Sequence, residues 1–209
     1  DEKDWHWSLG GKVKIKTNQV EISLLDLTGF NGRVDAIYFT KNKNDLPPNQ
    51  LETLDEFRIK KLGLNQNPKS SKFDFVVIGG GMAGTCAALS AARLGLKVAL
   101  IQNRPILGGN NSSEVRVHLG ARINLEPYPA LGNLVNEIGP QRGGNAQPKA
   151  YYEDQKKLDA VLNESNISLF LNHHANEVVM QGNTIQKVLA ENLETGEKLI
   201  FEAPIFADC

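Results

Sequence analysis

One glycine-rich motif constrains this chain more than any other feature. Residues 73–78 form a continuous β-rich run, and the pattern Gly-x-Gly-x-x-Gly follows directly, at the start of an alanine-rich segment with the composition of a helix. Between a strand and a helix, the first glycine permits a tight turn, the second lets a pyrophosphate approach the backbone, and the third lets the helix pack closely on the strand. The unpaired N–H groups of the helix then face the negative charge. The motif predicts dinucleotide binding by Gly79, Gly80, Gly81, Met82, Ala83 and Gly84.

The segments after the motif predict an α/β domain with a Rossmann-like sheet. Residues 82–94 are rich in alanine and end before Gly95, and residues 97–102 form a second apolar run that completes a βαβ unit. Helical spacing returns in residues 151–164, and a strand pattern follows in residues 167–171. Three short strands separated by turn sequences then predict a β-meander, which a last buried strand follows. These four strands cover residues 178–180, 184–191, 198–202 and 204–208.

The N-terminal residues have a different pattern. Residues 12–16 and 20–24 alternate apolar and polar side chains, residues 34–39 form a third strand-like run, and residues 51–62 carry the spacing of a helix that Gly63 ends. Three strands and one helix are too few for a closed domain, so we expect the end of a β-sandwich and a chain that is a fragment. The predicted organisation is a sandwich segment at residues 1–62, a polar linker at 63–72 and an incomplete dinucleotide-binding domain at 73–209.

The charge balance and the cysteines exclude several classes of site. With 23 Lys and Arg against 24 Asp and Glu, the net charge of −1 gives no support to binding of nucleic acid or of an anionic membrane. Two cysteines without a CxxC pair or a Cys/His cluster predict neither a disulfide framework nor a zinc site. The most apolar stretch is interrupted by Arg93 and Lys97, so no transmembrane segment is expected. A small molecule is the favoured partner.

The end of the second strand departs from the usual dinucleotide-binding pattern. An acidic residue is expected about 20 residues after the motif, where it accepts hydrogen bonds from the adenosine ribose. Gln102 occupies this place, and its amide oxygen can accept one such bond, at about half the strength of a charge-assisted one. Arg104 either pairs with a phosphate, as in NADP sites, or is a solvated loop arginine. Asn103 lies between the two and belongs to the predicted site.

A second Gly-Gly pair follows this strand, within residues 106–113. The pair and the Ser/Asn run after it bring backbone amides and hydroxyls to a diphosphate and a ribitol, which suits FAD better than NAD. The sequence here resembles the FAD-dependent oxidoreductases of the glutathione-reductase-like superfamily. Residues 102–116 resemble a bacterial branch whose members often carry an N-terminal β-sandwich, and residues 27–39 look like the end of that module. The resemblance places FAD against Gly108, Gly109, Asn110 and Ser113, and places its adenine against the backbone of Ala175.

The resemblance implies a flavoprotein in which FAD takes hydride from a small organic donor, with sugar-derived compounds of bacterial carbohydrate metabolism as one donor class. It assigns no catalytic residue and no metal site. It leaves the compartment open between the cytoplasm and the periplasm or exterior of a bacterial cell. Because the family has a further flavin loop beyond residue 209, this chain alone is expected to retain FAD weakly, to show no turnover and to self-associate through an exposed sheet edge.

Two other functions fit parts of the sequence. An NADP-dependent reductase would use Arg104 and the neutral Gln102 to accept a 2′-phosphate, although the β-meander argues against this class. A non-catalytic carbohydrate-binding protein would stack sugars on Trp5 and Trp7 of the sandwich segment and would keep the dinucleotide fold as a vestige. The two alternatives differ from the flavoprotein in what the purified protein binds.

Three polar patterns carry further expectations. Residues 114–118 alternate polar and apolar side chains, so an extended strand would place the three polar ones on one face, where they either line a substrate pocket or face water. These three are Glu114, Arg116 and His118. The charged residues of 154–159 are expected on the solvated face of a helix. The adjacent histidines at 173–174 would point to opposite faces of a strand, so they are not expected to share a metal.

Overall fold

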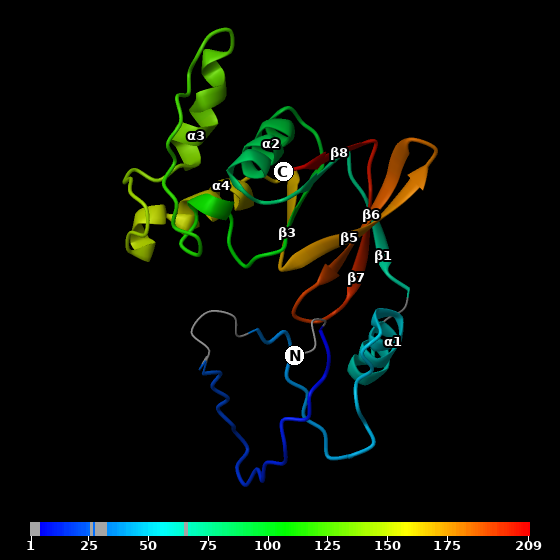
Figure 1. The fold of residues 1–209 in the computed structure, drawn as a ribbon. Coiled ribbons are helices and arrows are strands. Elements are labelled where there is room, and N and C mark those ends of the chain that lie inside the picture. The colour runs from blue at the N-terminus through cyan, green and yellow to red at the C-terminus, as the bar shows by residue number, and fades with distance from the viewer. Residues whose placement is uncertain (1–4, 26, 28–32, 65–66) are drawn as a thin grey trace. The chain divides into compact units, whose positions relative to one another are not determined.

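The chain divides into two compact units, residues 1–63 and residues 64–209, which are described separately. Figure 1 shows the fold in a computed structural model, which describes residues 5–25, 27, 33–64 and 67–209. Residues 28–32, which belong to the segment that resembles the end of a β-sandwich module, lie outside the described residues, as do residues 65–66 of the predicted linker.

The second unit is built on a parallel four-stranded sheet with the strand order β4-β3-β2-β8. Its strands are β2 (Phe75–Ile78), β3 (Val98–Gln102), β4 (Ile167–Leu171) and β8 (Ile205–Asp208). All three neighbouring pairs are parallel, and every residue of β3 is buried. A continuous apolar run is the pattern expected for a strand covered on both faces, so the predicted Rossmann-like α/β fold is confirmed.

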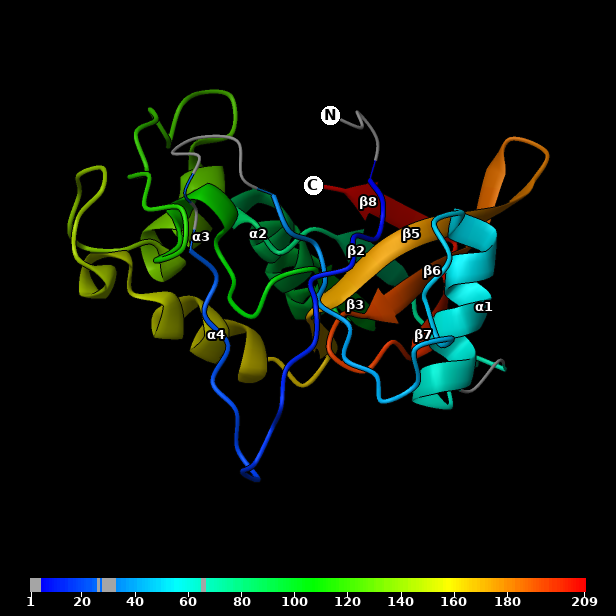
Figure 2. The same cartoon turned by 60° about the horizontal axis from the view of Figure 1, so that its bottom comes forward.

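Alternate side chains of the central strands enter two separate hydrophobic cores. Val77 and Leu100 pack with α2 (Met82–Arg93) on one face of the sheet. Val76 and Ala99 pack on the other face, where the meander covers them. Figure 2 shows α2 and the meander on opposite sides of the sheet. Each fully buried valine or leucine contributes about 1.5–3 kcal/mol to the stability of the fold, so both layers hold the sheet in place.

The helix after the glycine motif can lie close to the sheet because its inward side chains are small. Gly84, Ala88 and Ala92 of α2 are buried, and the helix ends at Arg93, one residue before the end of the predicted segment 82–94. The predicted order of strand, glycine loop, helix and strand is therefore confirmed. Alanine also has the highest helix propensity, so the local preference and the packing agree over this segment.

A second sheet has the strand order β1-β7-β6-β5. Its strands are β5 (His173–Gln181), β6 (Thr184–Asn192), β7 (Lys198–Glu202) and β1 (Lys69–Lys72). The first three form the predicted antiparallel meander. Three aromatic rings join this sheet to the parallel one: the centroid of Phe170 lies 4.8 Å from that of Phe201 and 6.3 Å from that of Phe73. The meander therefore covers the sheet through direct ring contacts.

The predicted linker at residues 63–72 is wrong over its second half, because Lys69–Lys72 forms β1 and pairs parallel to β7. All four side chains of β1 are exposed and polar, so no hydrophobic alternation marks the strand in the sequence. Its backbone hydrogen bonds to β7 hold it there, with one side-chain bond from the Ser70 hydroxyl to the Glu202 carboxylate at 2.6 Å. A strand held mainly by backbone pairing leaves little signal in its side chains.

Two further helices and three short 3-10 turns complete the second unit. The α-helices are α3 (Gly132–Ile138) and α4 (Asp154–Leu162), and the turns are η1 (Gly109–Asn111), η2 (Pro129–Leu131) and η3 (Lys149–Tyr152). The helix expected from residue 151 begins at Asp154 instead. The reason is that Glu153 has a left-handed backbone, with φ of 45°, which separates η3 from α4.

In the first unit the structure has one helix, α1 (Leu51–Leu62), which ends at Gly63 in a left-handed conformation, as predicted. The strands expected at residues 12–16, 20–24 and 34–39 are wrong: no strand occurs in the described part of residues 5–63. Their apolar side chains are exposed, with Val13 at 70%. Alternation makes a strand only where a neighbouring strand pairs with it. The assignment of this unit to a β-sandwich stays a prediction.

A cluster of one arginine and two glutamates links the C-terminal ends of α2, α3 and α4 in the second unit. Arg93, the last residue of α2, donates two hydrogen bonds to the carboxylate of Glu137 on α3, at 2.7 and 2.8 Å, and one to Glu164 after α4, at 2.6 Å. The guanidinium lowers the pKa of Glu137, and the two carboxylates raise the pKa of Arg93. A paired, fork-shaped contact of this kind is stronger than a single surface ion pair.

Replacing Glu137 by Gln should lower the free energy of unfolding by about 1 kcal/mol near neutral pH, since half-exposed pairs are screened by water. The pKa of Glu137 is lowered by folding, so its contribution is present above the unfolded pKa of about 4.3 and is lost as the pH falls through the folded value. Urea unfolding at neutral and acidic pH checks this. The stability difference between wild type and variant should shrink in acid, whereas Glu177→Gln, an exposed change on β5, should show no difference at either pH.

Candidate dinucleotide site

Two glycines of the first loop are required by close backbone contacts. A Cβ on Gly84 would lie 1.9 Å from the carbonyl oxygen of Gly79, so only glycine lets α2 start against the end of β2. Gly79 itself has a φ of 104°, and a Cβ there would lie 2.1 Å from the Cys209 carbonyl oxygen. The helix therefore begins directly above the carboxyl edge of the sheet, as the motif predicts.

Gly81 differs from its neighbours because it faces open space. It precedes the first residue of α2, its φ is −67°, and a Cβ there would meet no atom within 4 Å. The N–H groups of the first helical turn have no partners within the helix and carry the positive end of its dipole. An open glycine at this place leaves room for a phosphate to reach those groups.

The second glycine pair stacks on the first loop through the backbone. The Gly108 N–H donates to the Gly80 carbonyl at 2.8 Å, and Gly108 forms a parallel bridge with Gly81. Gly108 and Gly109 both have positive φ, of 109° and 56°, and a Cβ on Gly109 would lie 3.1 Å from the Gly81 Cα. The two glycine loops that the sequence indicates therefore form one continuous backbone surface.

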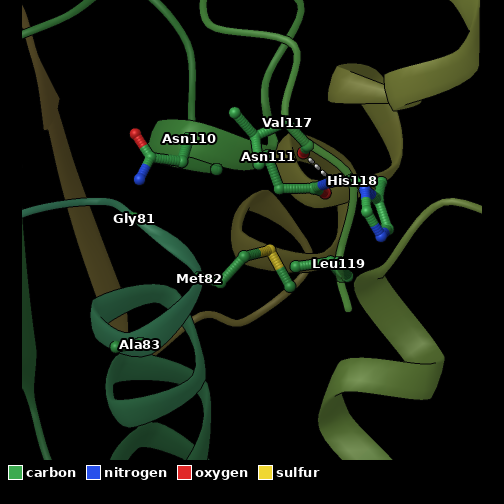
Figure 3. A pocket seen from close by; sticks show the side chains of 9 residues that line it. Gly81, Met82, Ala83, Asn110, Asn111, Val117, His118 and Leu119 are labelled. Atoms are coloured by element: carbon green, nitrogen blue, oxygen red, sulfur yellow. Dashed lines mark hydrogen bonds between the residues drawn. The ribbon is translucent and has the colours of Figure 1, made fainter. Parts of the chain in front are cut away.

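A pocket of about 280 Å³ opens on this surface. Figure 3 shows its walls: residues 81–83 at the start of α2, residues 108, 110 and 111 around η1, and residues 117–119 opposite them. Pockets that enclose a whole small ligand usually measure about 300–1,000 Å³. A space of this size suits the diphosphate and the adjoining sugar of a dinucleotide better than the entire molecule.

Asn111 places an unsatisfied acceptor beside the pocket. Its side chain is buried, and its Nδ2 donates to the Val117 carbonyl at 3.0 Å, the bond drawn in Figure 3. The amide oxygen is then left without a hydrogen-bond partner, the one such buried side-chain atom among the described residues. A buried acceptor of this kind gains about 1–3 kcal/mol from a donor. A sugar or ribityl hydroxyl is such a donor, so the site fits FAD. The sequence prediction named Asn110 and passed over Asn111.

The Gln102 side chain links the first glycine loop to the segment that leads into the second. Its side chain is buried, its Oε1 accepts the Gly80 N–H at 2.9 Å, and its Nε2 donates to the Ile106 carbonyl at 3.1 Å. A carboxylate could accept the first bond but would repel the second carbonyl. The structure thus gives a reason for a neutral amide at the place where an acid is usual. The ribose contact of Gln102 stays a prediction, which the second lone pair of the oxygen could serve.

The other predicted contacts lie around this centre. Asn103 and Arg104 are exposed after β3, and the Arg104 guanidinium pairs with the Glu114 carboxylate at 3.2 Å. Ser113 turns its N–H toward the carboxylate of Asp154. Ala175 lies on β5 of the meander and packs against the hydrophobic core between the two sheets. Their contacts with a cofactor stay predictions.

The extended strand expected at residues 114–118 is wrong. Residues 113–115 form a turn, and Arg116 has a left-handed backbone with φ of 62°. The alternation therefore does not place the polar side chains on one face. His118 still lines the pocket, and its backbone N–H and ring Nδ1 both lie within hydrogen-bond distance of the Asn145 amide oxygen, at 3.0 and 2.8 Å.

The solvated helix face expected at residues 154–159 is wrong in its middle. Lys157 is fully buried, and Asp154 accepts the Ser113 N–H at 3.0 Å. Lys156 donates to the Gly139 carbonyl at 2.6 Å. Charged side chains on a helix usually face water, so the pattern alone favoured that interpretation. One feature of the sequence could have indicated the burial of Lys157. The helix directly precedes β4, and β4 pairs with β3, the strand that leads into the second glycine loop.

The described residues outside the pocket were also compared with the requirements of a metal site and of a membrane-spanning helix. In the described residues, no three His, Cys, Asp or Glu side chains form a group that could hold a metal ion. His173 has its Nδ1 at 2.7 Å from the Leu171 carbonyl. Over the same residues, no helix has the length and apolar character needed to cross a membrane.

Comparison with known proteins agrees with this geometry. The soluble pyridine nucleotide transhydrogenase of Ectopseudomonas mendocina is 44% identical over 66 residues, 32% of this chain and 12% of that protein. Glycerol-3-phosphate dehydrogenase 2 of Mycobacterium bovis is 43% identical over 67 residues, 32% of this chain and 10% of that protein. A flavocytochrome c3 fumarate reductase in its open conformation shares the fold, with a TM-score of 0.51 and 16% identity over 73% of this chain and 36% of that one.

The chain thus spans about a tenth of the curated relatives and about a third of the solved structure. The model of one protein family matches residues 74–209, which include both glycine loops, the parallel sheet and the meander. FAD is therefore the cofactor, and the chain belongs to the FAD dependent oxidoreductase family.

Proposed function

We propose that this chain is the FAD-binding part of an enzyme that oxidises a small organic donor, with the bound FAD taking up the hydride. The observation that carries the proposal is the open glycine surface at the start of α2, with the unsatisfied Asn111 oxygen beside it, in a chain of the FAD dependent oxidoreductase family. The family match does not favour the NADP-dependent reductase or the carbohydrate-binding protein.

In this proposal, the residues of this chain bind the cofactor and orient it. Gly81 leaves room for the diphosphate at the N-terminus of α2, and the N–H groups there stabilise its charge. Asn111 accepts a hydrogen bond from a hydroxyl of the sugar chain, which fixes the direction in which the cofactor leaves the pocket. Gln102 keeps the two loops at the spacing that this arrangement needs.

For the donor, we propose a polyhydroxylated or sugar-derived alcohol. The support is the resemblance of residues 102–116 to a bacterial branch of the family, together with one relative whose name is glycerol-3-phosphate dehydrogenase. That relative matches over 32% of this chain, so it supports the class of reaction more than the donor.

Anaerobic mixing of the flavin-loaded enzyme that contains this chain with aldoses, polyols and their phosphates tests this proposal. A donor of the proposed class should bleach the visible absorbance of the flavin, and the spectrum should return on admission of oxygen or a dye. Bleaching by NADPH, with none of these compounds active, would contradict the proposal in favour of a pyridine-nucleotide reductase.

Gly81→Val should abolish FAD retention without unfolding the protein. The backbone at Gly81 has an ordinary φ and no atom lies within 4 Å of the added Cβ, so the side chain has room in the empty site and fills the place of the phosphate. Flavin absorbance per mole of purified protein measures retention, and far-UV circular dichroism checks the fold. The matched control is Gly143→Val, which is equally open. Wild-type flavin content in Gly81→Val would show that the diphosphate lies elsewhere.

Gln102 variants separate its two roles. Gln102→Leu removes both bonds between the loops, so we expect the free energy of unfolding of the apoprotein to fall by about 2 kcal/mol and FAD binding to weaken with it. Gln102→Glu keeps an acceptor for Gly80 and faces the Ile106 carbonyl with a negative oxygen. If the side chain also reaches the ribose, Gln102→Glu should bind FAD at least as tightly as wild type although its apoprotein is less stable. Weaker binding by both variants would leave only the loop-joining role.

A further inference from the structure

A buried lysine lies directly behind the second glycine loop. Lys157 is fully buried on α4, and a Cβ on Gly108 would lie 2.9 Å from both its Cδ and its Cε. Gly108 is also part of the pocket wall. The backbone at Gly108 therefore separates the aliphatic part of the Lys157 side chain from the pocket.

The ammonium of Lys157 has an oxygen partner but no ion pair. Its Nζ donates to the Tyr152 carbonyl, and in the described part of the chain no carboxylate lies within salt-bridge distance of it. Asp154, at the start of the same helix, directs both carboxylate oxygens to the Ser113 N–H. A cation taken out of water without a paired anion costs several kcal/mol, so the folded apoprotein carries charge that an incoming anion can stabilise.

The segment that bears Lys157 is also tied to the loop at both of its ends. Tyr152 is buried, and its hydroxyl lies 2.7 Å from the Arg116 carbonyl and 2.9 Å from the Gly144 carbonyl. Asp154 holds Ser113 by the bonds just described. Residues 152–157 therefore meet residues 108–116 at three places, Gly108, Ser113 and Arg116, and the long side chain of Lys157 is held behind Gly108.

We propose that Lys157 is a positioning residue whose buried charge, acting through the backbone layer at Gly108, strengthens the binding of the FAD diphosphate. The inference depends on FAD as the cofactor and is independent of the donor. A diphosphate on the open face of the glycine surface supplies the anion that Lys157 lacks. At the low effective dielectric of a buried site, such an attraction persists over a distance at which water would screen it.

The charges around Lys157 define how its effect depends on pH. Burial lowers the pKa of Lys157, while Asp154 and Glu153 raise it and Lys156 lowers it. The loop at residues 108–113 carries no titratable side chain. The elements packed on α4 are α2, α3 and β4, whose titratable side chains are Cys86, Arg93 and Glu137. The last two pair with each other.

The direction in which pH changes the Kd for FAD follows from the shift in the pKa of Lys157. The bound diphosphate raises the pKa of Lys157 above its value in the apoprotein, so between these two values the apoprotein has lost the proton and the complex keeps it. FAD binding should then take up a proton, and the Kd for FAD should rise with pH. Below both values the lysine is charged in both states, and the Kd should not change with pH on its account.

The test is reconstitution of the apoprotein with FAD, followed by flavin fluorescence, for wild type, Lys157→Met and Lys156→Met. Near neutral pH we expect Lys157→Met to raise the Kd about tenfold and Lys156→Met to leave it within about twofold. As the pH rises toward the ordinary lysine pKa of about 10.4, the Kd of wild type and of Lys156→Met should rise, and the Kd of Lys157→Met should stay level. A merely structural lysine would weaken binding by the same factor at every pH.

A measurement on wild type keeps the proposal falsifiable if Lys157→Met does not fold. Calorimetry of FAD binding in buffers of different ionisation enthalpy counts the protons taken up, and the proposal requires uptake in the alkaline range. Equal Kd values and parallel pH profiles for the three proteins, or no proton uptake by wild type, would overturn it. Failure of every donor to bleach the flavin, with these results intact, would contradict the proposed reaction and leave the role of Lys157 standing.

Discussion

The close approach of backbone to backbone at the carboxyl edge of the parallel sheet determines the arrangement of everything around the pocket. Gly84 rests on the Gly79 carbonyl, and Gly109 approaches the Gly81 Cα, at separations that a side chain would prevent. Because these contacts need no side chains, the first turn of α2 and the loop before η1 can share one surface. The buried Gln102 and Leu107 then fill the space beneath Gly80. The pocket is a consequence of this packing.

The electrostatics of the site follow from the same arrangement. The start of α2 presents unpaired N–H groups, and Lys157 lies behind Gly108 on the second glycine loop. The carboxylate of Asp154 accepts a hydrogen bond from the backbone N–H of Ser113 in that loop. Each of these features favours an anion in the pocket, and they come from separate parts of the chain. Agreement between independent elements is stronger support for a diphosphate site than the glycine motif alone.

The sequence could predict those parts of the fold in which local pattern and burial agree. The apolar runs of β2 and β3 and the glycine spacing predicted the βαβ unit because both faces of the sheet are covered. Alternation failed at residues 114–118, where a left-handed Arg116 turns the chain, and β1 left no alternation to find. Lys157 was missed for a different reason: a lysine on a helix is usually solvated, and only the tertiary structure brings the glycine loop over it.

The neutral Gln102 and the buried Lys157 are two parts of one charge arrangement. An acid at position 102 would bring a negative charge beneath the first loop, next to the Ile106 carbonyl, and it would offset part of any attraction that a cation behind the second loop exerts on a phosphate. With an amide there, two neutral hydrogen bonds hold the loop, and no negative charge at position 102 adds to the influence of Asp154 and Glu153 on Lys157. The amide at the place of the usual acidic residue therefore leaves the proposed attraction between Lys157 and a diphosphate unopposed from the first loop.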